Sequence, residues 1–176
     1  MVAIVQIREE TGATPTYTDK TAGTVRMKMA DDATVDANNP LVIPATDQNY
    51  TYEKWLRLYI GTTGPDNEIT NPKFYLDGSN DYGTGVKLWA TLDGTHSTPV
   101  SPSTANDPPQ HDAGAMTNAF TYTSGAPLAL DVTNTGPYSG TSVNMADHLI
   151  LVMEAEAGAT QGSLSAETAT FVYDES

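Results

Sequence analysis

The sequence predicts an all-β domain, an antiparallel β-sandwich of jelly-roll or immunoglobulin-like type with about nine strands and long loops. Three observations predict it. Apolar and polar residues alternate in several segments with the two-residue period of a half-buried strand. Threonine, whose branched β-carbon favours strands over helices, is abundant. Short runs of Gly, Pro, Asn and Asp separate the alternating segments, as turns separate antiparallel strands.

The strands are predicted where one face is apolar and the other polar. The clearest segments are 25–29, 56–60, 86–92, 149–153 and 168–173, and the weaker ones are 2–8, 73–76, 118–123 and 127–132. In 149–153 both faces are apolar, which predicts a strand covered on both sides. Turns are expected at 63–67, 77–81, 93–94 and 134–137. The only helical window, 155–166, is interrupted by Gly158 and Gly162, so we expect no helix there.

The predicted organisation is a single sandwich over residues 22–176, preceded by residues 1–21 as an N-terminal arm or as a first strand plus linker. Two long segments, 30–49 and 93–117, contain several prolines and no apolar period. Segments of this length inside a domain are either solvated surface loops or loops that contact a partner, and the sequence leaves both open. The apolar patch 41–43 is expected to lie extended on the surface.

Composition excludes several classes of function. The chain of 176 residues has a formal net charge of −14, which repels nucleic-acid phosphates and predicts no nucleic-acid partner. It has no cysteine, and therefore no disulfide, thiolate metal site or cysteine nucleophile. No apolar run approaches the roughly 20 residues that span a bilayer, so no membrane association is expected. Residues 1–10 lack the features of a secretory signal, which predicts synthesis in the cytoplasm without processing.

Catalytic motifs are weak. The histidines His96, His111 and His148 show neither HxH nor HExxH spacing. His111 and the adjacent Asp112 could join a serine only if the fold assembled them, and no G-x-S-x-G elbow is present. His148 is expected to cap or pack at the start of a strand. Glu154 and Glu156 share a strand face, either as a glycosidase-like carboxylate pair or, as we favour, at a solvated strand end.

Two acidic clusters are candidate cation sites. Residues 77–81 offer oxygen ligands at alternate positions, as at the start of a calcium loop. Tyr82 and Leu88 stand where an EF-hand has glycine and glutamate, so a hairpin turn is the favoured interpretation. The second cluster is Asp31 and Asp32 with Asp36. We therefore assign no catalytic, cofactor-binding or metal residue, expect no cofactor, and predict that the protein is not an enzyme.

Three aromatic residues lie opposite the aliphatic faces of their predicted strands: Trp55, Tyr59 and Trp89. They either fill a second core layer or form a surface that stacks on sugars or contacts a protein. The second option makes a carbohydrate-binding β-sandwich module, presenting Trp55 or Trp89 to sugar rings, an alternative function.

Four segments carry a resemblance to a known class of protein: 52–61 (YEKWLRLYIG), 71–78 (NPKFYLDG), 83–91 (GTGVKLWAT) and 161–176 (QGSLSAETATFVYDES). They resemble small head decoration, or cement, proteins of tailed bacteriophages. The resemblance implies a non-enzymatic virion protein, made in the host cytoplasm, that binds the outer capsid surface and stabilises capsomer contacts. Its implied partners are the major capsid protein and further copies of itself, with a homotrimer favoured. A tail or baseplate component is the alternative within the same class.

Overall fold

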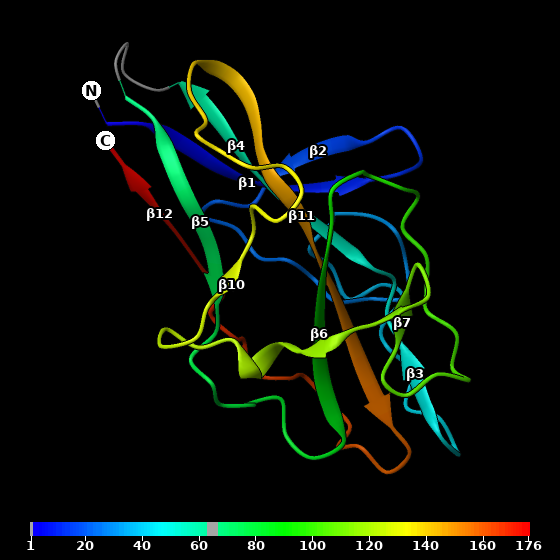
Figure 1. Cartoon of the computed structure of the whole chain (residues 1–176). Coiled ribbons are helices and arrows are strands. Elements are labelled where there is room, and N and C mark those ends of the chain that lie inside the picture. Colours follow the sequence, from blue (N-terminus) through cyan, green and yellow to red (C-terminus); the bar gives the residue numbers. More distant parts are fainter. Residues whose placement is uncertain (1, 63–66) are drawn as a thin grey trace.

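The alternating segments form two antiparallel sheets in the computed structural model, which describes residues 2–62 and 67–176 (Figure 1). The main sheet has the order β2 (Thr16–Asp19), β1 (Ile4–Thr11), β4 (Lys54–Thr62), β11 (Thr141–Glu156), β6 (Val86–Asp93) and β9 (Thr117–Asn118), and β3 (Gln48–Tyr50) also pairs with β11. The second sheet has the order β10 (Leu128–Ala129), β5 (Ile69–Tyr75) and β12 (Thr170–Glu175). The hairpin β7 (Gln110–His111) and β8 (Gly114–Ala115) stands apart, and η1 (Ala119–Thr121) is a single 3-10 turn. The predicted all-β antiparallel fold is confirmed.

The larger core lies between the two sheets. Leu56 of β4, Leu88 of β6 and Leu151 of β11 point from the inner face of the main sheet and are at most 5% exposed. Ile69 and Phe74 of β5 meet them from the second sheet and are fully buried. The alternation therefore correctly predicts which residues face the core. Each inward residue removes apolar surface from water, while its neighbours in the strand face away.

A second, smaller core lies on the outer face of the same main sheet. Trp55, Ile150 and Val152 are fully buried there, and Tyr50 and Met116 cover them. Met116 belongs to the long segment that leaves β6 and crosses this face before returning as β9. The prediction that residues 149–153 are covered on both sides is confirmed.

An irregularity in β11 connects this strand to the segment that follows β10. Between Met145 and Leu149 the pairing with β4 shifts, and Ala146 has a positive φ of 58°. Such a bulge bends a strand and re-aims its side chains. Here it brings the Asp147 carboxylate to the backbone N–H groups of Thr133 and Asn134, at 2.7 and 2.8 Å.

The predicted strand at 25–29 is wrong. This segment forms no ladder, and its backbone makes isolated bonds such as that from the Met29 N–H to the Asn39 carbonyl. Lys28, expected to face water, is only 1% exposed, and its ammonium group forms ion pairs with Asp32 and Asp36, whose side chains stay partly exposed. The alternation in 25–29 reflects side-chain polarity only. It does not indicate whether a neighbouring strand is available for backbone pairing.

The remaining predicted elements vary in their agreement. Residues 118–123 hold the end of β9 and η1, and 127–132 contain only the short β10. Residues 155–166 contain no helix, as expected. The predicted turn at 63–67 lies outside the described residues except for Asn67. Residues 2–21 contain β1, which lies inside the main sheet between β2 and β4 (Figure 1), and the Ala3 backbone N–H donates to the Glu175 carboxylate near the other end of the chain.

Candidate functional site

A group of ionisable side chains surrounds Trp55 on the outer face of the main sheet. The indole has no exposed surface and contacts three imidazole rings, with ring centroids 4.9 Å away for His96 and 5.3 Å away for both His111 and His148. His148 comes from β11, His111 from β7, and His96 from the segment after β6. The fold therefore gathers all three histidines that the sequence separates.

His111 lies between two carboxylates. Its Nδ1 is 2.8 Å from Glu53 Oε1, and its Nε2 is 3.1 Å from Asp93 Oδ2. Burial on its own lowers the pKa of His111, but the bonds to Glu53 and Asp93 outweigh it and raise the pKa to about 9. The ring is therefore protonated at neutral pH and donates from both nitrogens. A general base needs a free lone pair, which this histidine lacks.

The carboxylate of Glu53 is itself fully bonded. Its Oε2 accepts from the Trp55 indole N–H at 3.1 Å and from the Val100 backbone N–H at 3.3 Å. The side chain is 1% exposed. These bonds fix the carboxylate and, through it, the orientation of the His111 ring.

The other two histidines have different surroundings. His148 Nδ1 lies 3.1 Å from the Asp93 carbonyl, and its Nε2 lies 3.2 Å from Glu10 Oε2. His148 is therefore a packing residue, as expected, although it lies in the middle of β11 and not at a strand start. Burial lowers the pKa of His96, and its buried Nε2 has no hydrogen-bond partner among the described residues.

A second ionic group lies on the inner side of β1 and β4. The Glu9 carboxylate forms ion pairs with the ammonium groups of Lys20 and Lys54, both at 3.2 Å, and all three side chains are at most 4% exposed. The ammonium groups also donate to loop carbonyls, Lys20 to Thr24 and Ala33, and Lys54 to Ala30 and Asp32. These bonds hold residues 24–33, the start of the first long loop (24–47), on the sheet.

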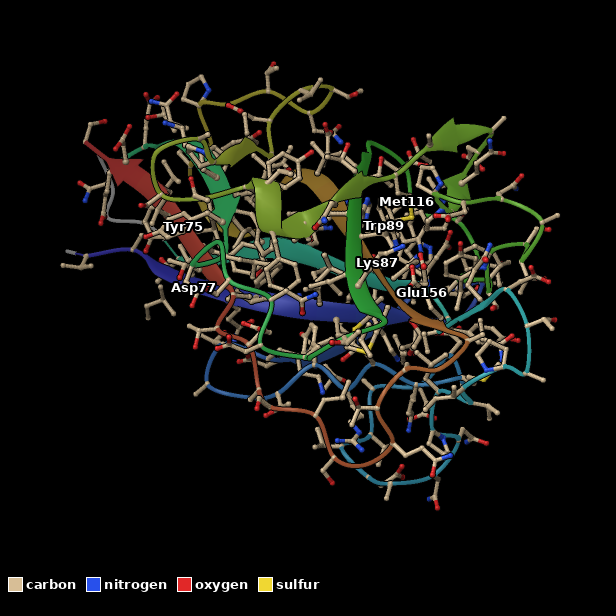
Figure 2. The ribbon with its side chains drawn as sticks, turned by 90° about the horizontal axis from the view of Figure 1, so that it is seen from below. Tyr75, Asp77, Lys87, Trp89, Met116 and Glu156 are labelled. Atoms are coloured by element: carbon tan, nitrogen blue, oxygen red, sulfur yellow. The ribbon has the colours of Figure 1, made fainter. Side chains whose placement is uncertain are left out.

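The two glutamates considered as a glycosidase pair are placed differently from the expectation of a solvated strand end. Glu154 is fully buried, and it lies opposite Tyr50 of β3 and Lys87 of β6. It accepts from Lys87 at 3.0 Å and from the Trp89 indole at 2.7 Å, and Lys87 also pairs with the half-exposed Glu156. Figure 2 shows Lys87, Trp89 and Glu156 together beside β6. One cation thus neutralises both carboxylates.

The aromatic residues are largely engaged inside the protein. Trp55 fills the second core layer, so it presents no face to a sugar ring. Tyr59 is covered by the Arg8 guanidinium, 3.1 Å from its ring centroid. Trp89 is partly buried and packs against the same outer core.

Residues 77–81, expected as a hairpin turn, instead connect β5 of the second sheet to β6 of the main sheet, and this acidic cluster gains a third carboxylate. Oxygens of Asp77, Asp81 and Glu167 lie within 4.8 Å of one another, and Glu167 accepts from the Asp81 backbone N–H at 2.6 Å. Burial, followed by the charges of the two aspartates, raises the pKa of Glu167. In the other cluster, Asp32 and Asp36 are ion-paired with Lys28, so they face a cation that the chain supplies.

A cavity of about 800 Å³ opens on the opposite, inner side of the main sheet. Its floor consists of aliphatic side chains such as Leu56, Leu88 and Leu151, and its walls come from the segments 20–27, 40–43 and 160–169. Neither the three histidines nor Glu53 or Asp93 line this cavity. The expected apolar patch 41–43 forms part of its wall, with Val42 exposed and its two neighbours packed toward the core.

Comparison with known proteins finds no match to a family model, to a curated protein or to a solved structure. Among the described residues there is no helix long and apolar enough to cross a membrane. Sequence reasoning identified the histidines but missed Glu53, Asp93 and Glu9. No local signal marks these residues, because their partners are distant in the chain.

Proposed function

We propose that this protein is a non-enzymatic structural component of a tailed-phage virion, which binds the outer surface of the assembled head and holds neighbouring capsomers together. Its partners are the major capsid protein and other copies of itself, arranged as a trimer. The identity of the partner rests on the resemblance of segments 52–61, 71–78, 83–91 and 161–176 to decoration proteins.

One observation carries the non-catalytic part of the proposal. The buried histidines and their carboxylates occupy the outer face of the main sheet, while the cavity of about 800 Å³ opens on the inner face. An active site needs titratable groups that converge on a space where a substrate fits. Here the main sheet separates the histidine group, in which His111 is held between Glu53 and Asp93, from the cavity. The ionisable residues that do line the cavity include Lys20, which is ion-paired with Glu9, and Glu167, which accepts from the Asp81 backbone N–H. This arrangement favours a protein that acts through its surface.

Exposed apolar side chains on the surface suit contacts with a protein partner. Large apolar side chains are exposed on irregular segments, and these are Val35, Val42, Val100, Val132 and Leu164. Val100 exchanges hydrogen bonds with Glu53, and the Val42 carbonyl accepts from the Asn49 side chain. Apolar side chains on segments fixed in this way bury surface on binding without a large ordering cost.

Fractionation of virions tests the proposal. Particles of the phage that encodes the chain are separated into heads and tails, and the purified chain is added back to stripped heads. We expect the chain in the head fraction at fixed stoichiometry, rebinding to heads, and a solution mass three times the 18.7 kDa of one chain. Its presence in tails alone would support the baseplate alternative, and its absence from particles would refute the proposal.

A further inference from the structure

We propose that His111, Asp93 and Asp112 form a binding site for a first-row divalent transition metal, with zinc as its representative, and that the metal fastens the long segment 94–112 to the main sheet. This inference is independent of the proposed capsid role. The three residues each place a ligand atom within 4.8 Å of the other two. The shared point is His111 Nε2, which lies 3.1 Å from Asp93 Oδ2 and 3.8 Å from Asp112 Oδ2. Metal binding releases the Nε2 proton to solvent, and the freed lone pair becomes the ligand while Nδ1 keeps its proton.

The surroundings of the imidazole resemble those of a metal ligand. A metal-bound histidine characteristically donates its other ring N–H to a carboxylate, which fixes the tautomer and increases the basicity of the ligand. Glu53 is that carboxylate, 2.8 Å from His111 Nδ1. Since Glu53 is held by the Trp55 indole and the Val100 backbone, the ring is oriented with Nε2 toward the two aspartates before any metal arrives.

The hairpin turn explains how adjacent residues reach one point. His111 pairs with Gly114 across β7 and β8, so Asp112 and Ala113 are the two central residues of the turn. Both have positive φ, 45° and 63°, as in a type I′ turn. Asp112 is 77% exposed at its side chain, whereas His111 is 7% exposed. The site therefore has one buried anchor and one ligand that is accessible from solvent.

Charge and ligand type select the metal. Three carboxylates, from Glu53, Asp93 and Asp112, surround a single imidazole, which leaves net negative charge for a divalent cation to neutralise. One nitrogen with two carboxylate oxygens suits zinc and its neighbours, whereas calcium and magnesium prefer oxygen ligands alone. Water completes the coordination on the solvent side of Asp112.

Zinc titration of the full chain by calorimetry at neutral pH tests the site. We expect one zinc ion per chain, a higher melting temperature with zinc, and no comparable effect of magnesium. Asp112→Asn, at an exposed position, is expected to weaken zinc binding by at least about tenfold without changing the metal-free melting temperature. The matched control Asp77→Asn, in the separate cluster of Asp77, Asp81 and Glu167, is expected to leave zinc affinity unchanged.

The imidazole itself provides a second readout that does not depend on variants. Long-range proton–nitrogen spectra of the histidines distinguish a doubly protonated ring from one whose Nε2 binds metal while Nδ1 keeps its proton. We expect the second pattern for His111 at saturating zinc. Persistence of the doubly protonated pattern, or zinc affinity that is lost in Asp77→Asn and retained in Asp112→Asn, would overturn the proposal.

Discussion

The buried group of Glu9, Lys20 and Lys54 makes a strong prediction about stability. Glu9→Gln preserves the shape of the side chain but removes its charge, which leaves two ammonium groups, at most 4% exposed, without their carboxylate. Breaking a buried ion pair by removing one partner costs about 3–5 kcal/mol. This is a large part of the roughly 5–15 kcal/mol that stabilises an ordinary domain.

Urea unfolding at neutral pH measures this cost. With a urea dependence of about 2 kcal/mol per M, the midpoint of Glu9→Gln is expected to fall by roughly 2 M. The control is Glu156→Gln, which removes the half-exposed partner of Lys87 and is expected to cost no more than about 1 kcal/mol. A Glu9→Gln protein within 1 kcal/mol of the control would refute the argument that the triad is buried and coupled.

A triple replacement separates the charges from the loop bonds. Exchanging Glu9, Lys20 and Lys54 together for Leu, Met and Met leaves no unpaired charge, and such exchanges are often neutral or stabilising. Here the carbonyls of the 24–33 segment also lose their ammonium donors. We therefore expect the triple variant to recover only part of the lost stability, with faster hydrogen exchange confined to the first loop. Full recovery would show that the lysine–carbonyl bonds contribute little.

Three further predictions concern single sites. Ala113→Gly is expected to raise the free energy of unfolding by about 0.5–1 kcal/mol, because Ala113 has a φ of 63° that glycine adopts without strain; an unchanged urea midpoint would contradict this. Trp55→Phe removes the indole donor to the buried Glu53 carboxylate and part of the outer core. In the same assay we expect the free energy of unfolding to fall by about 2–3 kcal/mol, and a fall below 1 kcal/mol would argue against that contact. The Lys28 hydrogen bond lowers the pKa of Asp32 below 3.8, so the stabilisation is present above pH 3.8 and is lost as the pH falls through the lowered value. The stability gap between the wild type and Lys28→Met should therefore narrow toward acid, and a pH-independent gap would count against the pair.

The long strands could be predicted from the sequence because their side-chain pattern and their packing agree. In β4 and β6 alternate residues are apolar, and the same residues reach the inner core. In β11 the unbroken apolar run 149–153 correctly indicates cover on both faces. Short strands such as β3 have no such signal, because three residues contain too little pattern and their pairing depends on the neighbour β11.

The ionic clusters could not be predicted, because their partners are far apart in the chain. Glu53 and His111 are 58 residues apart, and Glu10 and His148 are 138 residues apart. No periodicity relates such pairs. Each of these charged residues, taken alone, is of a type that usually lies on the solvent-exposed surface. The burial of Glu154 could not be predicted for the same reason, since Tyr50 and Lys87, which lie opposite it, come from distant segments.

The unequal size of the two sheets explains why these clusters exist. The second sheet contains only β10, β5 and β12, so it leaves part of the inner face of the wider main sheet without strand cover. The loop that covers the remainder has no ladder of its own, and buried lysines replace the ladder by donating to its carbonyls. The outer face is covered in a comparable way, by a segment clamped through His111.

Segments fixed by buried charges have a defined shape before they meet a partner. Under the proposed capsid role, the exposed Val42 and Val100 would then bind without the cost of ordering a mobile loop. Glu9→Gln should therefore weaken head binding mainly by slowing association, because fewer molecules have the first loop in its binding conformation. If head binding were unchanged while the loop exchanged freely, the first loop would not be part of the contact surface.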